Sequence, residues 1–213
     1  LGGQTLIAKR APTRQDFDGA TRWSSGQCRK LGVDIRLDTE ATLETVINES
    51  PDHAMLATGA RARPHGLAGV DGHRMVSAWD VLLGKAGDLG HTLLVIDEEY
   101  GHQGTTVALY LLERGHEVDL ITSQETIANF LGTTTRPPLL TRLFKHQAQI
   151  FNHLEAKELR DGHLVARNIW SDELHQVGPY EGFVYAYGGL RVDPLGEPLK
   201  ARGIQVEGIG DAF

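Results

Sequence analysis

Residues 91–122 carry the pattern that decides the fold. They begin with His91-Thr92-Leu93-Leu94-Val95-Ile96-Asp97-Glu98-Glu99-Tyr100-Gly101-His102-Gln103-Gly104 and end with Glu117-Val118-Asp119-Leu120-Ile121-Thr122. The apolar run at 91–96 predicts a strand, and the helical spacing of apolar residues in 105–114 predicts a helix. The alternation in 117–122 predicts a second strand, and Gly115 fits the left-handed position after a helix end. Strand, helix and strand within roughly 30 residues form a βαβ unit, whose two strands are parallel.

The loop after the first strand differs from a dinucleotide-binding loop. Such a loop has the pattern Gly-x-Gly-x-x-Gly and opens the helix, whereas the first two glycine positions here are Asp97 and Glu99. Carboxylates at these positions would repel a pyrophosphate, and their side chains would block the close backbone approach that glycine permits. No acidic residue closes the second strand at Thr122-Ser123 to hold a ribose. The sequence therefore argues against bound NAD(P) in this unit.

Weaker patterns on both sides of the βαβ unit extend the α/β character to the rest of the chain. We predict a helix over 20–31, strands over 32–37 and 53–59, a short helix over 77–84, a helix starting at Pro137-Pro138, short strands and turns over 154–187, and a last strand over 204–210. Regular elements along the whole length indicate a folded chain of one large or two small domains.

Composition limits the classes of partner. The 21 Lys and Arg against 28 Asp and Glu give a net charge of −7, which argues against nucleic acid or an anionic membrane as partner. No apolar run approaches the length of a membrane span, and we expect a cytoplasmic protein. The 25 glycines exceed the usual share of about 7% and indicate many tight turns or close backbone approaches to a ligand.

Several kinds of catalytic centre are excluded by residue type. The single cysteine, Cys28, cannot form a redox pair, and it argues against a pyridine nucleotide–disulfide reductase. The ten histidines show no metal-binding spacing, and the chain has no Gly-x-Ser-x-Gly elbow. We predict no catalytic and no metal-ligating residues. Trp23, Trp79 and Trp170 are most simply interpreted as packing residues.

Three short glycine-containing segments are candidates for backbone approach to a ligand. They are Leu1-Gly2-Gly3-Gln4, Ala57-Thr58-Gly59-Ala60-Arg61 after a predicted strand, and Gly210-Asp211 after the last strand. Small residues at the carboxyl end of a strand let a ligand approach the backbone, and an aspartate there can accept from sugar hydroxyls. Taken alone, each segment is more simply interpreted as an ordinary turn or loop.

Taken in order, these motifs resemble one family of multidomain flavoproteins. The order is Leu-Gly-Gly-Gln, a helix, Gly-Val-Asp-Ile-Arg, Ala-Thr-Gly-Ala, Ala-Trp-Asp-Val-Leu-Leu-Gly, the βαβ unit and Ile-Gly-Asp-Ala. It resembles the carboxyl-terminal half of the enzymes related to trimethylamine dehydrogenase and 2,4-dienoyl-CoA reductase. In that family a barrel carries FMN and a [4Fe–4S] cluster and is followed by two domains of nucleotide-binding type. The acidic loop resembles the trimethylamine dehydrogenase branch, in which electrons leave to a protein acceptor.

The resemblance implies cofactor-binding residues. They are Gly2, Gly3 and Gln4, beside the position that holds the adenine ribose of FAD or ADP; Ala57, Thr58, Gly59, Ala60 and Arg61, in the turn that lines that nucleotide; and Gly210 and Asp211, near the ribityl chain or the pyrophosphate. Ala186-Tyr187-Gly188-Gly189 stands where a second Ala-Thr-Gly turn is usual and departs from it. The family's first glycine-rich turn is expected upstream of Leu1, and its helix after Gly-Asp-Ala is expected beyond Phe213. We therefore expect a fragment whose nucleotide site is incomplete.

The resulting prediction is an α/β chain with two Rossmann-like, three-layer domains of the FAD/NAD(P)-binding type, one inserted in the other. The outer domain is predicted at 1–83 and 185–213, and the inner, degenerate NAD(P)-like domain at 84–184. The resemblance implies a fragment of a flavin-dependent amine dehydrogenase or demethylase, with ADP or FAD possible in this chain and FMN and [4Fe–4S] outside it. The implied partners are the catalytic barrel, an electron-transfer flavoprotein and further copies of the parent enzyme. The alternatives are a non-enzymatic interaction module without nucleotide and a fragment of an NADPH-dependent enoate or dienoyl-CoA reductase.

Overall fold

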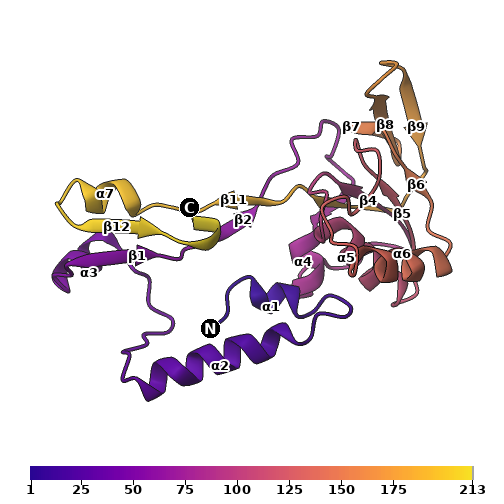
Figure 1. Ribbon diagram of the computed structural model, residues 1–213. Helices are drawn as coiled ribbons and strands as arrows, with labels where there is room; N and C mark the ends of the chain where they lie inside the picture. The colour runs from indigo at the N-terminus through magenta and orange to yellow at the C-terminus, as the bar shows by residue number, and fades with distance from the viewer. Residues whose placement is uncertain (213) are drawn as a thin grey trace. The chain divides into compact units, whose positions relative to one another are not determined.

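A computed structural model describes residues 1–212 of the 213-residue chain (Figure 1). The chain divides into two compact units. Unit 1 comprises residues 1–6, 16–61 and 189 onward, and unit 2 comprises residues 7–15 and 62–188. The predicted domain boundaries at 84 and 185 remain a prediction.

Unit 2 is built on the predicted βαβ unit. Strand β4 (Thr92–Asp97) is followed by helix α5 (Gln103–Leu112) and strand β5 (Glu117–Ile121), and β4 and β5 are parallel. Gly115 has φ +89°, as predicted for the residue that lets the chain leave the helix. The strand order β3-β10-β4-β5-β6 completes a parallel sheet with β3 (Arg74–Ser77), β10 (Gly182–Ala186) and β6 (Ile150–Phe151).

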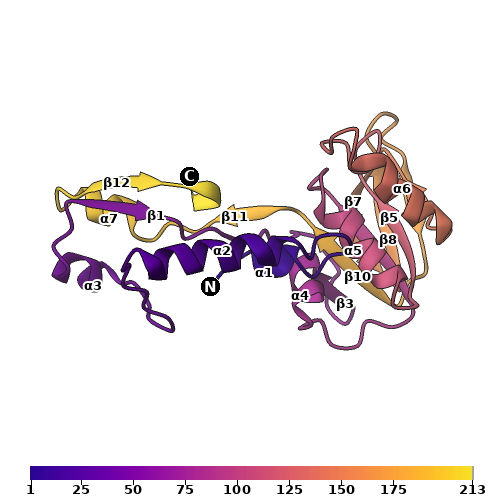
Figure 2. The same ribbon diagram turned by 60° about the horizontal axis from the view of Figure 1, so that its bottom comes forward.

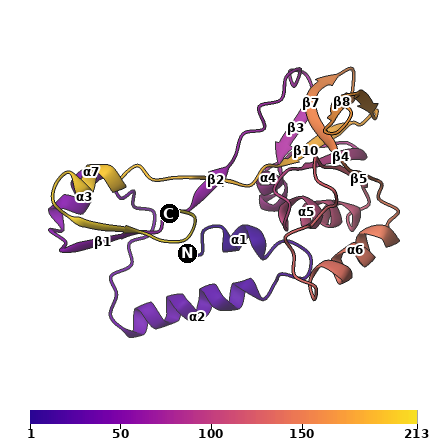
Figure 3. The same ribbon diagram turned by 45° about the horizontal axis from the view of Figure 1, so that its top comes forward.

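The parallel sheet is the middle of three layers. Helices α4 (Ala78–Leu83), α5 and α6 (Arg136–Lys145) lie on one side, and the antiparallel strands β7 (Leu154–Arg160), β8 (His163–Asn168) and β9 (Leu174–Val177) lie on the other (Figure 3). Strand β4 shows why both faces are apolar: Leu93 and Val95 pack with the helices, whereas Leu94 and Ile96 pack with β7 and β8. This confirms the predicted α/β class, with the three layers present in unit 2.

Unit 1 has less sheet and a smaller core. Strands β1 (His53–Leu56) and β12 (Gln205–Gly208) run parallel and side by side (Figure 2), and β2 (Ala60–Ala62) pairs with β11 (Gly189–Arg191). The helical elements are α1 (Thr5–Ala8, which ends in unit 2), α2 (Phe17–Lys30), α3 (Leu43–Asn48), α7 (Gly196–Lys200) and η1 (Gly210–Ala212). The buried cluster is formed by Leu56, Leu195 and Leu199.

Two predictions from local pattern are wrong. Residues 32–37 form no strand, and Val33 and Leu37 are more than half exposed, because the segment pairs with no neighbouring strand among residues 1–212. Trp23 and Trp170 are exposed rather than packed, at 68% and 78%. Trp79 does pack against the unit 2 core, and its indole N–H donates to Gln103 Oε1 at 3.0 Å.

Candidate functional site

The carboxyl ends of β1 and β12 bring two of the predicted segments together. In their parallel register Leu56 lies opposite Gly208, and the Ile209 N–H donates to the Leu56 carbonyl at 2.9 Å. The segments 57–59 and 210–211 therefore leave the same edge of the two-stranded sheet, although about 150 residues separate them in sequence.

Gln4 lies against the same turn. Gly59 has φ +68°, and a Cβ placed on it would stand 3.2 Å from Gln4 Nε2. The turn of Gly2 (φ +117°) and Gly3 (φ +48°) precedes Gln4 and is held by the Thr5 hydroxyl, which donates to the Gly2 carbonyl at 2.5 Å. Left-handed glycines thus place the Gln4 amide beside the end of β1.

Some of the remaining predicted residues hold the turn in place by hydrogen bonds, and others are exposed to solvent. The Thr58 hydroxyl donates to the Val192 carbonyl, and the Val192 N–H donates to the Gly59 carbonyl at 3.0 Å, so both connect the turn to the chain after β11. Ala60 and Arg61 belong to β2, with Arg61 exposed. Gly210 and Asp211 are exposed in η1, and a Cβ on Gly210 would meet no other atom of the described residues within 4 Å.

A groove of about 520 Å³ lies beside β1 in unit 1. Of the predicted site residues only Ala57 and Thr58 line it, together with Val46, Leu56 and Leu195. Arg36 also lines it and is held by Glu49 at 2.6 Å and by Asp34 at 2.8 Å. Arg36 was not among the predicted site residues; its partner Asp34 is two residues away, but Glu49 comes from the end of α3 and is brought to it only by the fold.

In unit 2, Asp97 ends β4 and is fully buried. Its Oδ1 accepts from the backbone N–H groups of Glu99 at 3.3 Å and Tyr100 at 3.4 Å, while Oδ2 has no hydrogen-bond partner among residues 1–212. Burial, with the nearby charge of Glu99 as the second cause, raises the pKa of Asp97 to about 7. The side chain lies against Gly104, where a Cβ would stand 2.2 Å from Asp97 Cγ.

The next two carboxylates occupy separate hydrogen-bonding positions. Glu99 Oε2 accepts from the backbone N–H groups of Gly101 and Gln103, both at 3.0 Å, at the amino end of α5. Glu98 accepts from the Ser123 N–H at 3.0 Å, from the Ser123 hydroxyl at 2.5 Å and from the Tyr100 hydroxyl at 3.0 Å. Burial raises the pKa of Glu98, and these three donors oppose that rise. Backbone and hydroxyl donors thus hold the Glu98 and Glu99 carboxylates at separate positions, although the charges of both still act on Asp97.

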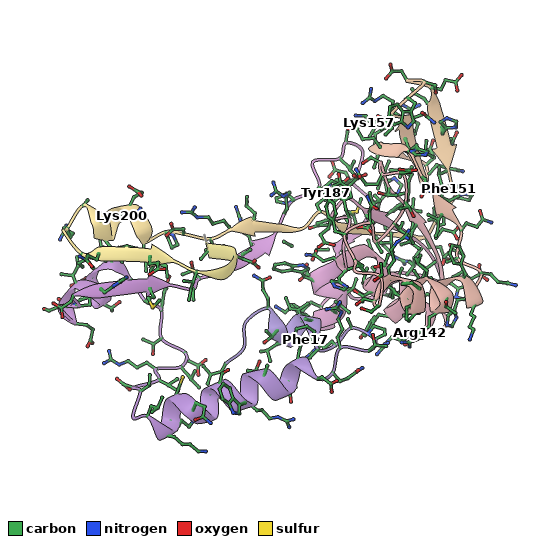
Figure 4. All side chains as sticks on the ribbon, viewed as in Figure 1. Phe17, Arg142, Phe151, Lys157, Tyr187 and Lys200 are labelled. Atoms are coloured by element: carbon green, nitrogen blue, oxygen red, sulfur yellow. The ribbon has the colours of Figure 1, made fainter. Side chains whose placement is uncertain are left out.

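A second groove, of about 740 Å³, opens at this carboxyl edge of the parallel sheet. It is lined by Glu98, Tyr100 and Ser123, and by Lys157 and Tyr187, which Figure 4 labels. Burial raises the pKa of the Tyr187 phenol, and the negative charge of Glu98 adds to the shift. Within the described part of the chain no group of His, Cys, Asp and Glu is arranged to hold a metal ion.

Two curated proteins show what the chain is similar to. It is 33% identical to N,N-dimethylglycine/sarcosine dehydrogenase of Chromohalobacter salexigens over 153 residues. These residues make up 69% of this chain and 22% of that protein. It is 29% identical over 204 residues to a probable N-methylproline demethylase of Rhizobium meliloti, covering 93% of this chain and 30% of that protein. The resemblance to the trimethylamine dehydrogenase and 2,4-dienoyl-CoA reductase family is confirmed. No family model matches the chain.

Two solved structures resemble the fold, one over nearly the whole chain and one over three quarters of it. The 6-hydroxypseudooxynicotine amine oxidase of Pseudomonas geniculata N1 matches 99% of this chain with a TM-score of 0.87 and 22% identity, over 34% of its own length. The thioredoxin reductase of T. acidophilum matches 76% of this chain with a TM-score of 0.54 and 14% identity, over 57% of its own length, which shows a likeness of fold. The chain spans between a fifth and a third of the two curated relatives, so it corresponds to part of such flavin-dependent oxidoreductases. Within residues 1–212 no helix is long and apolar enough to cross a membrane.

Proposed function

We propose that this chain supplies the nucleotide-binding-type domains of a flavin-dependent dehydrogenase or demethylase of N-methyl amines. Unit 1 binds the ADP part of FAD, or ADP itself, and unit 2 is an NAD(P)-like domain that holds no dinucleotide. FMN and an iron–sulfur cluster belong to the parent's barrel, outside this chain. The barrel is the domain partner, and an electron-transfer flavoprotein accepts the electrons.

One observation carries the nucleotide assignment. The edge formed by β1 and β12 gathers the 57–59 turn, the Gln4 amide and the Gly210-Asp211 pair, which are distant in sequence. The residues fit an adenosine phosphate: a Cβ on Gly210 would meet no other atom of residues 1–212 within 4 Å, and Asp211 offers an exposed carboxylate to sugar hydroxyls. In this role Gln4 donates its amide to a ligand oxygen, and the 57–59 turn positions the backbone.

Titration of the full chain with ADP tests this assignment. A ligand that binds only the folded chain stabilises it by RT ln(1 + [L]/Kd), about 1.4 kcal/mol at ten times Kd, and raises the unfolding temperature. We expect Asp211→Ala to weaken ADP binding about tenfold, since a hydrogen bond to a charged group contributes about 1.5–3 kcal/mol. Glu207→Ala, on β12 and also exposed, is the matched control and leaves binding unchanged.

Two results would reject the assignment. One is the absence of any ADP-induced shift at millimolar concentration, which would favour the non-enzymatic module. The other is equal weakening by Asp211→Ala and Glu207→Ala, which would point to general electrostatics.

An NADPH-dependent enoate or dienoyl-CoA reductase is the second candidate for the parent. It is favoured by likeness to a cinnamate reductase of Clostridium sporogenes, 32% identical over 133 residues, which cover 62% of this chain and 19% of that protein. The carboxylates of the 97–99 segment argue against it. A clear NADPH-induced stabilisation of the full chain would reverse that preference.

A further inference from the structure

The β4–α5 loop holds its own anions at the positions where this type of domain binds a dinucleotide. In a βαβ unit the pyrophosphate lies on the N–H groups at the start of the helix, and the adenosine ribose lies at the end of the second strand. Here those positions are the amino end of α5, around Gly101 and Gln103, and the residues after β5, beginning with Thr122-Ser123.

The first position is filled by Glu99. Its Oε2 stands 3.0 Å from the backbone nitrogen atoms of both Gly101 and Gln103, which is the contact that a phosphate oxygen makes at a helix amino end. The charge of Arg14 also acts there, since the Glu99 charge raises the pKa of Arg14 against the larger lowering by burial. Arg14 hydrogen-bonds the ring of His102, whose pKa is lowered to about 4 by burial and by the Arg14 charge.

The second position is filled by Glu98. It accepts from both the backbone N–H and the hydroxyl of Ser123, the residue placed to contact a ribose or its 2′-phosphate. Glu98 and Ser123 both line the groove at the carboxyl edge of the sheet, so this pairing lies within the nucleotide crevice.

A third observation is independent of these hydrogen bonds. Asp97 is fully buried, and its Oδ2 has no hydrogen-bond partner in the described part of the chain; the side chain fills the space between the end of β4 and Gly104 in the first turn of α5. Glycine at position 97 would leave that space to the backbone and to a phosphate.

We propose that Glu99 and Glu98 act as an internal ligand, which takes the pyrophosphate and ribose positions of unit 2 and thereby closes its crevice to dinucleotides. The inference rests on the proposed function of unit 2 as an NAD(P)-like domain without dinucleotide, and it adds the mechanism by which the dinucleotide is excluded. Occupation differs from charge repulsion in one measurable way: removing only the charge of Glu99 leaves the position filled, whereas removing the side chain empties it.

The test compares two variants of the full chain, with inorganic pyrophosphate as the probe and calorimetry as the readout. Glu99→Gln removes the charge and keeps an amide oxygen for the same N–H groups, and Glu99→Gly empties the position. We expect Glu99→Gly to bind pyrophosphate at least about tenfold more tightly than Glu99→Gln, a difference of about 1.4 kcal/mol. Glu117→Gln removes the same charge at the opposite end of the sheet and stays at the level of the unsubstituted chain.

Equal affinities for the two Glu99 variants would overturn the inference, because repulsion alone would then explain the closed crevice. If Glu99→Gly fails to fold, Glu99→Ser replaces it, since a short hydroxyl still accepts from the first turn and leaves room for phosphate. Gain of pyrophosphate binding in a chain that shows no ADP binding would reject the function proposed for unit 1 and still support this inference.

Discussion

At the scale of single residues, Asp97 is the most constrained ionisable group of the loop. It is fully buried, faces the charges of Glu99 and Glu98, and receives two long backbone hydrogen bonds on Oδ1, while no group of residues 1–212 bonds Oδ2. Burial of a carboxylate without full pairing favours the protonated form. The raised pKa therefore means that ionising Asp97 opposes folding.

The first prediction concerns the pH dependence of stability. In the unfolded chain Asp97 ionises near 3.8, and in the folded chain near 7, so the folded state loses stability as pH rises between these values. Between pH 5 and pH 8 the ionisation of Asp97 lowers the free energy of unfolding by about 2–3 kcal/mol, because each pH unit between the start of this range and the folded-state pKa costs about 1.36 kcal/mol. We expect Asp97→Asn to remove this part of the decline in urea unfolding experiments.

The control is Asp71→Asn, at an exposed position of the same unit. It leaves the pH profile of the unfolding free energy unchanged. A decline of the same size in Asp97→Asn and in the unsubstituted chain would show that Asp97 ionises normally in the folded state.

At the scale of elements, the approach of β4 to α5 depends on one glycine. Gly104 lies in the first turn of α5, and a Cβ there would stand 2.2 Å from Asp97 Cγ and 2.5 Å from Asp97 Oδ2. The third glycine of a dinucleotide loop has the same packing role, to bring helix and strand close together. Gly104 therefore has this packing role, although it stands two residues beyond the third glycine position of the pattern that starts at Asp97.

We expect Gly104→Ala to destabilise the chain by about 1–3 kcal/mol, the usual cost of overpacking a buried contact. Adding Asp97→Gly restores the space, so the double variant loses less stability than the sum of the two single ones. Gly132→Ala is the matched control, because a Cβ there meets no atom within 4 Å. Additive losses in the double-variant cycle would mean that the two residues do not share this contact.

At the scale of the whole molecule, the two units differ in how much apolar side chain they bury. Unit 2 has apolar clusters on both faces of its sheet, whereas the buried cluster of unit 1 is formed by Leu56, Leu195 and Leu199. Helix α2 in unit 1 buries no residue. Local opening free energy rises with such burial, so the units should open independently and at different cost.

Hydrogen exchange of the full chain measures this difference. We expect amides of α2 and β1 to exchange at least about 100-fold faster than those of β4 and β10, which corresponds to about 3 kcal/mol of opening free energy. Saturating ADP is expected to slow exchange in β1 and β12 and to leave β4 and β10 unchanged, because the proposed site lies in unit 1. Uniform protection across both units would contradict the prediction.

The sequence by itself determined the elements whose pattern is local and strong. Apolar runs and alternation placed β4, α5 and β5, and Gly115 marked the exit from the helix, because burial on both faces of a parallel strand forces a nearly continuous apolar run. The same reasoning failed at 32–37, where the residues alternate but no strand within the described residues pairs with the segment. It also failed for Trp23 and Trp170, because residue type alone does not determine exposure.

Only the tertiary structure decided which of the candidate residues meet. The sequence named Gln4, Gly59 and Gly210 separately, and the parallel pairing of β1 with β12 and the turn before α1 placed them at one edge. The sequence likewise showed three acidic residues at 97–99 and predicted repulsion. Their separate partners, Glu98 on Ser123 and Glu99 on the amino end of α5, depend on where the second strand and the helix lie in space. Hydrogen bonds between segments distant along the chain leave no periodic trace in sequence, which is the physical reason that the fold class was predictable and the arrangement of the site was not.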